Sequence, residues 1–194
     1  MTQLPIEKFT EWFEEAKNCP QVNDATEVCL ATASKAGRPS ARMVLLKSFD
    51  DRGFCFFTNY TGRKSRELIE NPFASMCFYW NALGKQIRIE GRVEKLSAAE
   101  SDEYFNTRPE GSKLGTWVSQ QSSELESRGK FFDALEAAKN KFTGKDIPRP
   151  EFWGGWRIVP DVIEFWEAEQ FRYHKREVFE RMKDGNWDSR LLYP

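Results

Sequence analysis

The sequence predicts an α+β fold in which antiparallel hairpins form a small β-barrel and a few helices lie outside it. Three observations lead to this prediction. Strand-like runs follow one another with only short turns between them. The run QIRIEGRVE at residues 86–94 alternates apolar and polar residues over most of its length, as in a strand with one buried face. No GxGxxG follows a strand, which disfavours a doubly wound parallel sheet.

Composition limits the class of protein before any motif is considered. With 194 residues, 40% of them hydrophobic and 14% aromatic, the chain suits one globular domain over residues 1–194. Its 29 basic and 30 acidic residues leave a net charge of -1, so no overall basic field draws it to nucleic acid or to an anionic membrane. Any anion that it binds must therefore be held by a local cluster of cations.

Several motifs that are absent from the sequence limit the cellular compartments and the reaction types that we expect. The N-terminus lacks the hydrophobic core of a signal peptide, and no run approaches the ~20 apolar residues that span a bilayer. The four cysteines show no CxxC spacing, so we expect a cytoplasmic protein with free thiols and no metal site. A single histidine, without GxSxG or HExxH, disfavours hydrolytic chemistry.

The first half of the chain begins with helix signals and continues with strand signals. Apolar residues recur at helical spacing over 5–18 and predict an amphipathic helix that packs on the main body, within an N-terminal helical segment of residues 1–23. A turn at residues 50–53 is expected to join its two flanking strands as a hairpin. The further elements expected here are strands at 28–33, 43–46 and 54–57 and a short helix at 64–71.

The second half begins with two more strands and continues with helices. Ser97 and Glu100 resemble a capping box and predict a helix to about residue 107. Residues 108–119 are expected to be loop-rich with a short helical piece. The other elements expected are strands at 74–80 and 86–96, the longest helix at 122–142, and three or four strands in the C-terminal part that ends with a hairpin at residues 185–186.

The stretch from Arg42 to Lys64 has the composition of a phosphate-binding site. Arg42 and Lys47 bracket its first strand, and Arg63 and Lys64 follow its second. Hydroxyls, a glycine and the start of a helix lie between them, and such groups together hold phosphates well. The alternative is a solvated hairpin end with ordinary surface charges.

Two segments in the middle of the chain offer further anion-binding groups. Tyr104, Arg108 and Ser112 close a helix and open a loop, and a phenol, a guanidinium and a hydroxyl can jointly hold a phosphate. Residues 121–123 are expected to cap the long helix, whose N-terminus would also attract an anion. An exposed helix end and a plain cap are the respective alternatives.

The only histidine lies in a cationic segment near the C-terminus. On a strand, Arg172, His174 and Arg176 would share one face because side chains alternate. Three potential cations in a row repel one another unless an anion or an electron-rich ring lies opposite, which makes this face a candidate ligand site. The alternative is an exposed edge strand whose basic residues deter aggregation.

Together these motifs resemble the pyridoxamine/pyridoxine 5′-phosphate oxidase family over about residues 24–194. Two places depart from the family's pattern: its usual HDR reads HKR at 174–176, and its Gln-Gly run reads EAE at 167–169. The segments that carry the resemblance, in the family's order and approximate spacing, are RMVLLK (42–47), FFTN (56–59), GRK (62–64), Gln86, YFNTRPEGS (104–112), WVSQQSS (117–123), FWGGWR (152–157), Phe165-Trp166 and Arg172-x-His174-x-Arg176.

The resemblance implies an FMN-binding split β-barrel that works as a homodimer, with FMN at the subunit interface and residues 150–194 completing the site. By motif position the residues at FMN would be Arg42, Met43, Val44, Leu45, Leu46, Lys47, Phe57, Thr58, Arg63, Lys64, Gln121 and Ser122, with Gln86, Trp166 and Arg176 contributed across the interface. Those at the substrate phosphate would be Lys47, Tyr104, Arg108 and Ser112. Arg172 and His174 match the pair over the pyridine ring, and Asp24 falls on an active-site position of the family.

The implied reaction is the oxidation of pyridoxamine 5′-phosphate, pyridoxine 5′-phosphate or both to pyridoxal 5′-phosphate. Hydride would pass from substrate C4′ to flavin N5, and dioxygen would reoxidise the flavin and give hydrogen peroxide. Two alternatives stay open at this point. One is a split-barrel flavoenzyme with another substrate, and the other is a carrier that binds pyridoxal phosphate without chemistry.

Overall fold

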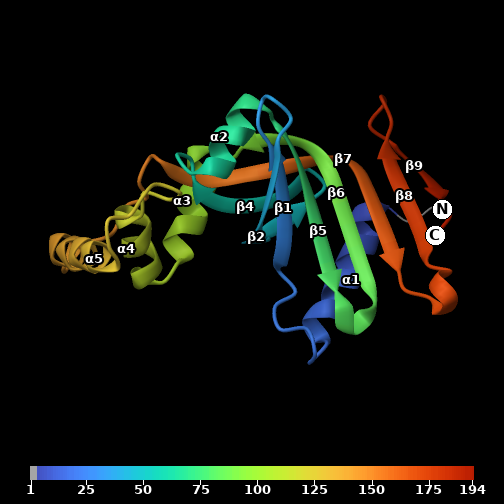
Figure 1. Cartoon of the computed structure of the whole chain (residues 1–194), viewed down its shortest axis with the longest axis horizontal. Coiled ribbons are helices and arrows are strands. Elements are labelled where there is room, and N and C mark those ends of the chain that lie inside the picture. Colours follow the sequence, from blue (N-terminus) through green and yellow to red (C-terminus); the bar gives the residue numbers. More distant parts are fainter. Residues whose placement is uncertain (1–3) are drawn as a thin grey trace.

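The computed structural model describes residues 4–194 and has one curled antiparallel sheet with helices around it (Figure 1). This arrangement confirms the α+β class expected from the sequence. The helices are α1 (Pro5–Asn18), α2 (Arg63–Glu70), α3 (Ala98–Thr107), α4 (Glu110–Val118) and α5 (Arg128–Phe142). The strands are β1 (Glu27–Ala33), β2 (Pro39–Leu45), β3 (Ser48–Asp50), β4 (Gly53–Asn59), β5 (Phe73–Trp80), β6 (Lys85–Lys95), β7 (Trp153–Glu167), β8 (Lys175–Arg181) and β9 (Trp187–Leu191).

The long strand β7 organises the sheet, whose main order is β2-β1-β5-β6-β7-β4-β3. One edge of β7 pairs with β6 along most of its length, while the other edge pairs first with β4 and then with β8, which carries β9. The register of β6 against β7 shifts between Glu90 and Gly91. A Cβ on Gly91 would lie 2.0 Å from the carbonyl oxygen of Val159, so only glycine allows the strands to approach here.

Helix α1 packs on the inside of the curled sheet, as the sequence predicted. Its apolar face buries Phe9, Phe13 and Ala16 in the main core. The ring of Phe9 lies edge-on to Phe54 and Phe78, with centroids 4.8 and 5.4 Å away. Two ion pairs, Lys8–Glu177 and Lys85–Glu15, hold the polar flank of the helix to β8 and β6.

The expected hairpin between residues 43–46 and 54–57 is wrong. β2 pairs with β1, from Glu27 opposite Leu45 to Ala33 opposite Pro39, and the three-residue β3 is the strand that pairs with β4. The turn at 50–53 was placed correctly. The chain leaves β2 at Leu46, which is buried in the core, and a new strand begins only at β3.

The helices at one end of the molecule form a second apolar cluster (Figure 1). The capping box predicted at the start of α3 is present, with Ser97 and Glu100 bonded reciprocally. The helix expected from residue 122 begins instead at Arg128, with Ser127 as its cap, because Ser122 has a left-handed backbone, with φ of 70°. Within residues 4–194, no helix has the length and apolarity needed to cross a membrane.

Candidate functional site

A cavity of about 710 Å³ lies between the sheet and the α3–α4 helices, a volume within the range of small-molecule sites. Strands β2 and β4, the start of α2, the end of α3 and helix α4 all contribute to its wall. Of the residues predicted for the site, it brings together Met43, Val44, Leu45, Lys47, Phe57, Thr58, Lys64, Tyr104, Arg108, Ser112 and Gln121.

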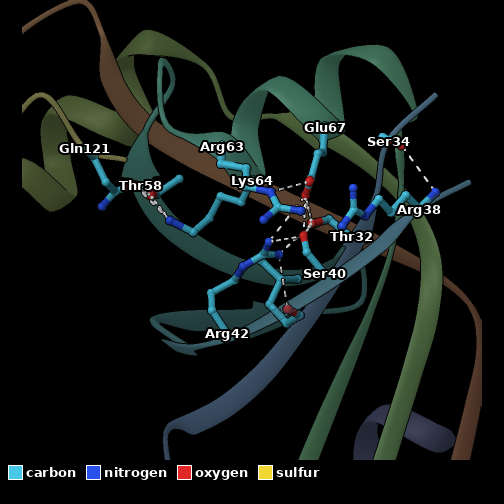
Figure 2. Close-up of polar contacts among 11 residues, drawn as sticks. Thr32, Ser34, Arg38, Ser40, Arg42, Thr58, Arg63, Lys64, Glu67 and Gln121 are labelled. Atoms are coloured by element: carbon cyan, nitrogen blue, oxygen red, sulfur yellow. Dashed lines mark hydrogen bonds and ion pairs between the residues drawn. The ribbon is translucent and has the colours of Figure 1, made fainter. Parts of the chain in front are cut away.

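One end of the cavity presents a cation with neutral partners. Lys64 lies in the first turn of α2, and its Nζ donates to Thr58 Oγ1 at 3.1 Å and to Gln121 Oε1 at 2.8 Å (Figure 2). Among residues 4–194, no carboxylate lies within ion-pairing distance of Lys64. Burial lowers the pKa of Lys64, and the charge of Arg42 lowers it further. A half-buried ammonium without a counter-ion favours an incoming anion.

The backbone just before Lys64 closely approaches the side chain of Gln121. Gly62 precedes α2, and a Cβ at this position would lie 2.7 Å from Gln121 Oε1. The helix N-terminus adds unpaired amide groups and a partial positive charge. These residues therefore fit a phosphate group, and the apolar side chains of β2 beside them fit a planar ring.

Arg42 and Arg63 do not line this cavity but lie beside Lys64, on strand β2 and in the first turn of α2. Both contact Glu67, one turn further along α2 (Figure 2). Burial alone would raise the pKa of Glu67, but hydrogen bonds from Thr32, Ser40 and Arg63 outweigh burial and lower the pKa to about 2. Glu67 is therefore ionised at neutral pH.

A second polar group lines the same cavity on the helical side. The ring of Tyr104 stacks on Phe57 with centroids 4.0 Å apart, and the Arg108 guanidinium lies 4.6 Å from the ring centroid of Trp153. Arg108 also donates to Thr116 Oγ1 at 2.6 Å. Burial raises the pKa of Tyr104 and lowers that of Arg108. Arg108 has no carboxylate partner within residues 4–194, so its charge too is available to an anion.

Four of the other predicted residues form a second cluster near the turn between β7 and β8. Gln86, Trp166 and Arg176 lie directly opposite one another across β6, β7 and β8. The buried carboxylate of Glu164 accepts from Arg176 Nε at 2.8 Å. The ring of His174 lies against Trp166 with centroids 4.6 Å apart, and His174 Nδ1 accepts the main-chain N–H of Glu169 at 3.2 Å.

The expectation that Arg172, His174 and Arg176 share one strand face is wrong. β8 begins only at Lys175, and residues Gln170–Arg172 form a 3₁₀ turn. Phe171 and Arg172 have φ of 56° and 66°, a backbone that is strained for residues with a Cβ. The alternation of a strand therefore does not apply before Lys175.

The two departures from the family's pattern contact each other in this turn. Lys175 Nζ lies 2.8 Å from Glu169 Oε1 and 3.9 Å from Glu167 Oε2. The pKa of Glu169 is lowered by its hydrogen bond from Lys175, and that of Lys175 is raised by the same contact. The positive charge of Lys175 is thus balanced locally by Glu167 and Glu169.

Besides Arg42 and Arg63, four residues of the predicted set lie outside both the cavity and the second cluster. Asp24 Oδ1 accepts the N–H and the hydroxyl of Thr26, which lower its pKa, and it lines a neighbouring cavity that shares Lys47 with the first. Leu46 is buried in the core. Ser122 and the exposed Arg172 do not line the described cavity.

The cavity also contains residues that were not singled out from the sequence. They are Asn59, Thr107, Pro109, Gly115, Thr116, Ser119 and Trp153. Most of them lie inside or next to the motifs that carried the resemblance. Thr116 lies one helical turn after Ser112, and that spacing was the available signal for it.

Two family models match most of this chain. The family model described as Pyridoxamine 5′-phosphate oxidase matches residues 14–140. The model described as Pyridoxine 5′-phosphate oxidase C-terminal dimerisation region matches residues 153–194. Together they span both the cavity and the second cluster.

Two bacterial oxidases match this chain along almost its whole length. A pyridoxine/pyridoxamine 5′-phosphate oxidase of Myxococcus xanthus (strain DK1622) is 47% identical over 190 residues, which cover 98% of this chain and 91% of that protein. One from Zymomonas mobilis (strain ZM4) is 46% identical over 194 residues and 100% of both chains.

Two solved structures share the fold. PhzG from Burkholderia lata 383, in complex with tetrahydrophenazine-1-carboxylic acid, has a TM-score of 0.93 at 34% identity and covers 100% of this chain and 94% of its own. An FMN-binding protein related to pyridoxamine 5′-phosphate oxidase, from Nostoc punctiforme PCC 73102, has a TM-score of 0.78 at 17% identity and covers 100% of both chains. The second likeness concerns the split-barrel fold alone.

Proposed function

The chain belongs to the pyridoxine/pyridoxamine 5′-phosphate oxidase family of enzymes, and on that premise we propose that it oxidises pyridoxamine 5′-phosphate, pyridoxine 5′-phosphate or both to pyridoxal 5′-phosphate. FMN is its cofactor and dioxygen is its electron acceptor. The observation that carries the proposal is one cavity with two groups of cations that lack an ion pair to a carboxylate within residues 4–194, Lys64 in one group and Arg108 with Lys47 in the other. Two phosphate esters, one on FMN and one on the substrate, account for both.

The residues around Lys64 hold the FMN phosphate. Lys64 and Arg63 supply charge, while Thr58 and Gln121 supply a hydroxyl and an amide beside them. Met43, Val44 and Leu45 lie along the flavin ring, together with Phe57. When bound, FMN would supply the N5 atom that accepts hydride from substrate C4′, and dioxygen would take up two electrons and two protons to leave as hydrogen peroxide; with the amine substrate, water would hydrolyse the resulting imine and release ammonia.

The residues on the helical side, together with Lys47 after β2, hold and orient the substrate. Arg108, Lys47, Tyr104 and Ser112 bind its phosphate, because each offers a donor to the same cavity. This placement keeps the reacting carbon at a fixed position relative to the cofactor ring, which is the main contribution of the protein to such chemistry. A substrate without the phosphate would lose these contacts.

A homodimer completes the site in this proposal. The second cluster lies near the end of the molecule that carries β8 and β9, whereas the cavity lies toward α3 and α4 (Figure 1). The cluster lies within the matched dimerisation region except for Gln86. Residues 150–194 of one subunit would therefore bring Arg172, His174, Trp166 and Arg176 to the cavity of its partner.

A second candidate is a split-barrel flavoenzyme that acts on another substrate. PhzG binds a tricyclic carboxylic acid that has no phosphate. The set of Lys47, Tyr104, Arg108 and Ser112 favours a phosphate ester over such a ligand, because its two cations and two hydroxyls match several acceptor oxygens. A carrier of pyridoxal phosphate without chemistry is the remaining alternative.

The visible spectrum of the FMN-reconstituted protein tests the proposal. Anaerobic addition of pyridoxamine 5′-phosphate should bleach the flavin bands, and air should restore them with release of peroxide. Pyridoxamine without the phosphate is the matched control and should bleach the flavin far more slowly. Bands that persist with both phosphate esters would reject the oxidase, and a protein that retains no FMN would reject the cofactor.

A further inference from the structure

We propose that Glu67 is the positioning residue of the flavin-phosphate cradle: its buried carboxylate holds Arg42 and Arg63 where they act on the phosphate. The inference rests on the proposed function, since it assumes that the anion at Lys64 is the phosphate of FMN. It adds a residue that lines neither the cavity nor the second cluster.

Glu67 is the centre of a polar network that joins three elements (Figure 2). Its Oε1 accepts from Arg63 Nε at 2.9 Å, and its Oε2 lies 3.3 Å from Arg42 Nη2. Oε2 also accepts the hydroxyl of Thr32 on β1 and that of Ser40 on β2, the latter at 2.7 Å. The side chain of Glu67 is only 8% exposed.

The network fixes the two arginines to different degrees. Arg42 also donates to the Leu30 carbonyl at 3.3 Å and to Thr32 Oγ1 at 2.6 Å, so its guanidinium is held on several sides. Arg63 contacts the carboxylate through Nε and is 56% exposed. Its two terminal nitrogens therefore stay available for a ligand, in an orientation that Glu67 sets.

The charge of the cluster matches the proposed ligand. Arg42, Arg63 and Lys64 carry three positive charges, and Glu67 carries one negative charge, since its pKa is about 2. The remaining two positive charges suit a phosphate monoester, which carries about -1.5 to -2 at neutral pH. A buried carboxylate this close to the cations of an anion site would oppose binding if charge alone mattered.

A role of Glu67 through its charge and a role through positioning the arginines therefore predict different effects of substituting it. If Glu67 acted only through its charge, Glu67→Gln would strengthen FMN binding and Glu67→Asp would leave it unchanged. If it positions the arginines, both changes weaken binding. Aspartate keeps the charge but withdraws the carboxylate by one methylene, so it no longer reaches both arginines.

The test compares FMN and riboflavin, which differ by the phosphate. Flavin-free protein is titrated with each ligand and the quenching of flavin fluorescence is recorded. We expect Glu67→Asp and Glu67→Gln each to raise the dissociation constant of FMN about tenfold and to change that of riboflavin less than twofold. Circular dichroism of each variant establishes that it is folded.

Glu70 provides the matched control. It lies on the same helix one turn later and is exposed, and Glu70→Gln removes the same charge without the network. FMN affinity should stay within about twofold in this variant. An FMN affinity of Glu67→Asp equal to wild type, or an equal loss of riboflavin affinity, would overturn the inference. Wild-type protein that binds neither flavin would instead reject the proposed function and remove its basis.

Discussion

The partners of each cation determine what that cation can do in the site. Arg176 is paired with the buried Glu164, and Arg42 is paired with Glu67, so these guanidinium groups are oriented before any ligand arrives. Lys64 contacts only a hydroxyl and an amide oxygen. The same physical rule gives His174 a defined role, because one of its ring nitrogens is already occupied.

His174 should act as a hydrogen-bond donor. Its Nδ1 accepts the N–H of Glu169, so in the neutral ring the proton lies on Nε2. Glutamine places an amide donor near the position of Nε2, whereas asparagine reaches only that of Nδ1. We expect His174→Gln to retain about ten to a hundred times more kcat/KM than His174→Asn, as for one hydrogen bond to a charged partner. Steady-state kinetics would contradict a donor role if the order were reversed.

The stability of the protein in acid should depend on Glu67. Its pKa is about 2 in the folded protein and 4.5 as the ordinary value, so the ionised form stabilises the fold above pH 4.5. This stabilisation is lost as the pH falls from about 4.5 toward 2 and amounts to about 3 kcal/mol. Urea unfolding should show Glu67→Gln less stable at pH 7, with the difference from wild type reduced to less than half near pH 3 and lost only below about pH 2. A pH-independent difference would contradict the assignment.

At the scale of elements, helix α1 depends on one aromatic side chain. Phe9 is fully buried and contacts the rings of Phe49, Phe54 and Phe78. Phe9→Ala should lower the free energy of unfolding by about 3–5 kcal/mol, since it leaves a cavity among these rings. Chemical denaturation measures this directly.

Phe171 is the control for that substitution. It is 80% exposed in the turn before β8, so Phe171→Ala should change the free energy of unfolding by less than about 0.5 kcal/mol. If Phe9→Ala and Phe171→Ala lowered the free energy of unfolding equally, α1 would not be anchored through Phe9.

Local patterns predicted the elements whose determinants lie within a few residues. The capping box of Ser97 and Glu100 and the helical spacing in α1 placed those helices correctly. Pairing partners were harder to predict, because β2 has the same composition whether it pairs with β1 or with β4. The turn at Phe171 and Arg172 escaped prediction because neither residue is a glycine, although both have positive φ.

At the scale of the whole molecule, motif order predicted which residues belong to a site but not how one chain distributes them. The cavity gathers predicted residues up to Gln121, while Trp166, His174 and Arg176 lie in the second cluster. Glu67 could not be identified from the sequence, since an exposed glutamate on a helix has the same local pattern. Its role depends on contacts from β1 and β2 that only the fold brings together.

Two inactive variants should restore each other if the site is shared between subunits. Arg108→Ala alters the cavity, and Arg172→Ala alters the turn before β8. In a mixed dimer, one site then combines an intact cavity with an intact turn, and the other site carries both changes. Random mixing makes half of the dimers mixed, so about a quarter of all sites are intact. Activity should rise toward about a quarter of the wild-type value.

A mixture of two variants that are both changed in the cavity is the control for any gain of activity that comes from mixing alone. Lys47 and Arg108 line the same cavity, so a mixture of Lys47→Ala and Arg108→Ala leaves every cavity with one change and should recover nothing. Subunits with two different tags allow the mixed dimers to be isolated and assayed. If isolated mixed dimers of Arg108→Ala and Arg172→Ala recover no activity, Arg172 acts within its own chain, because no partner contributes it.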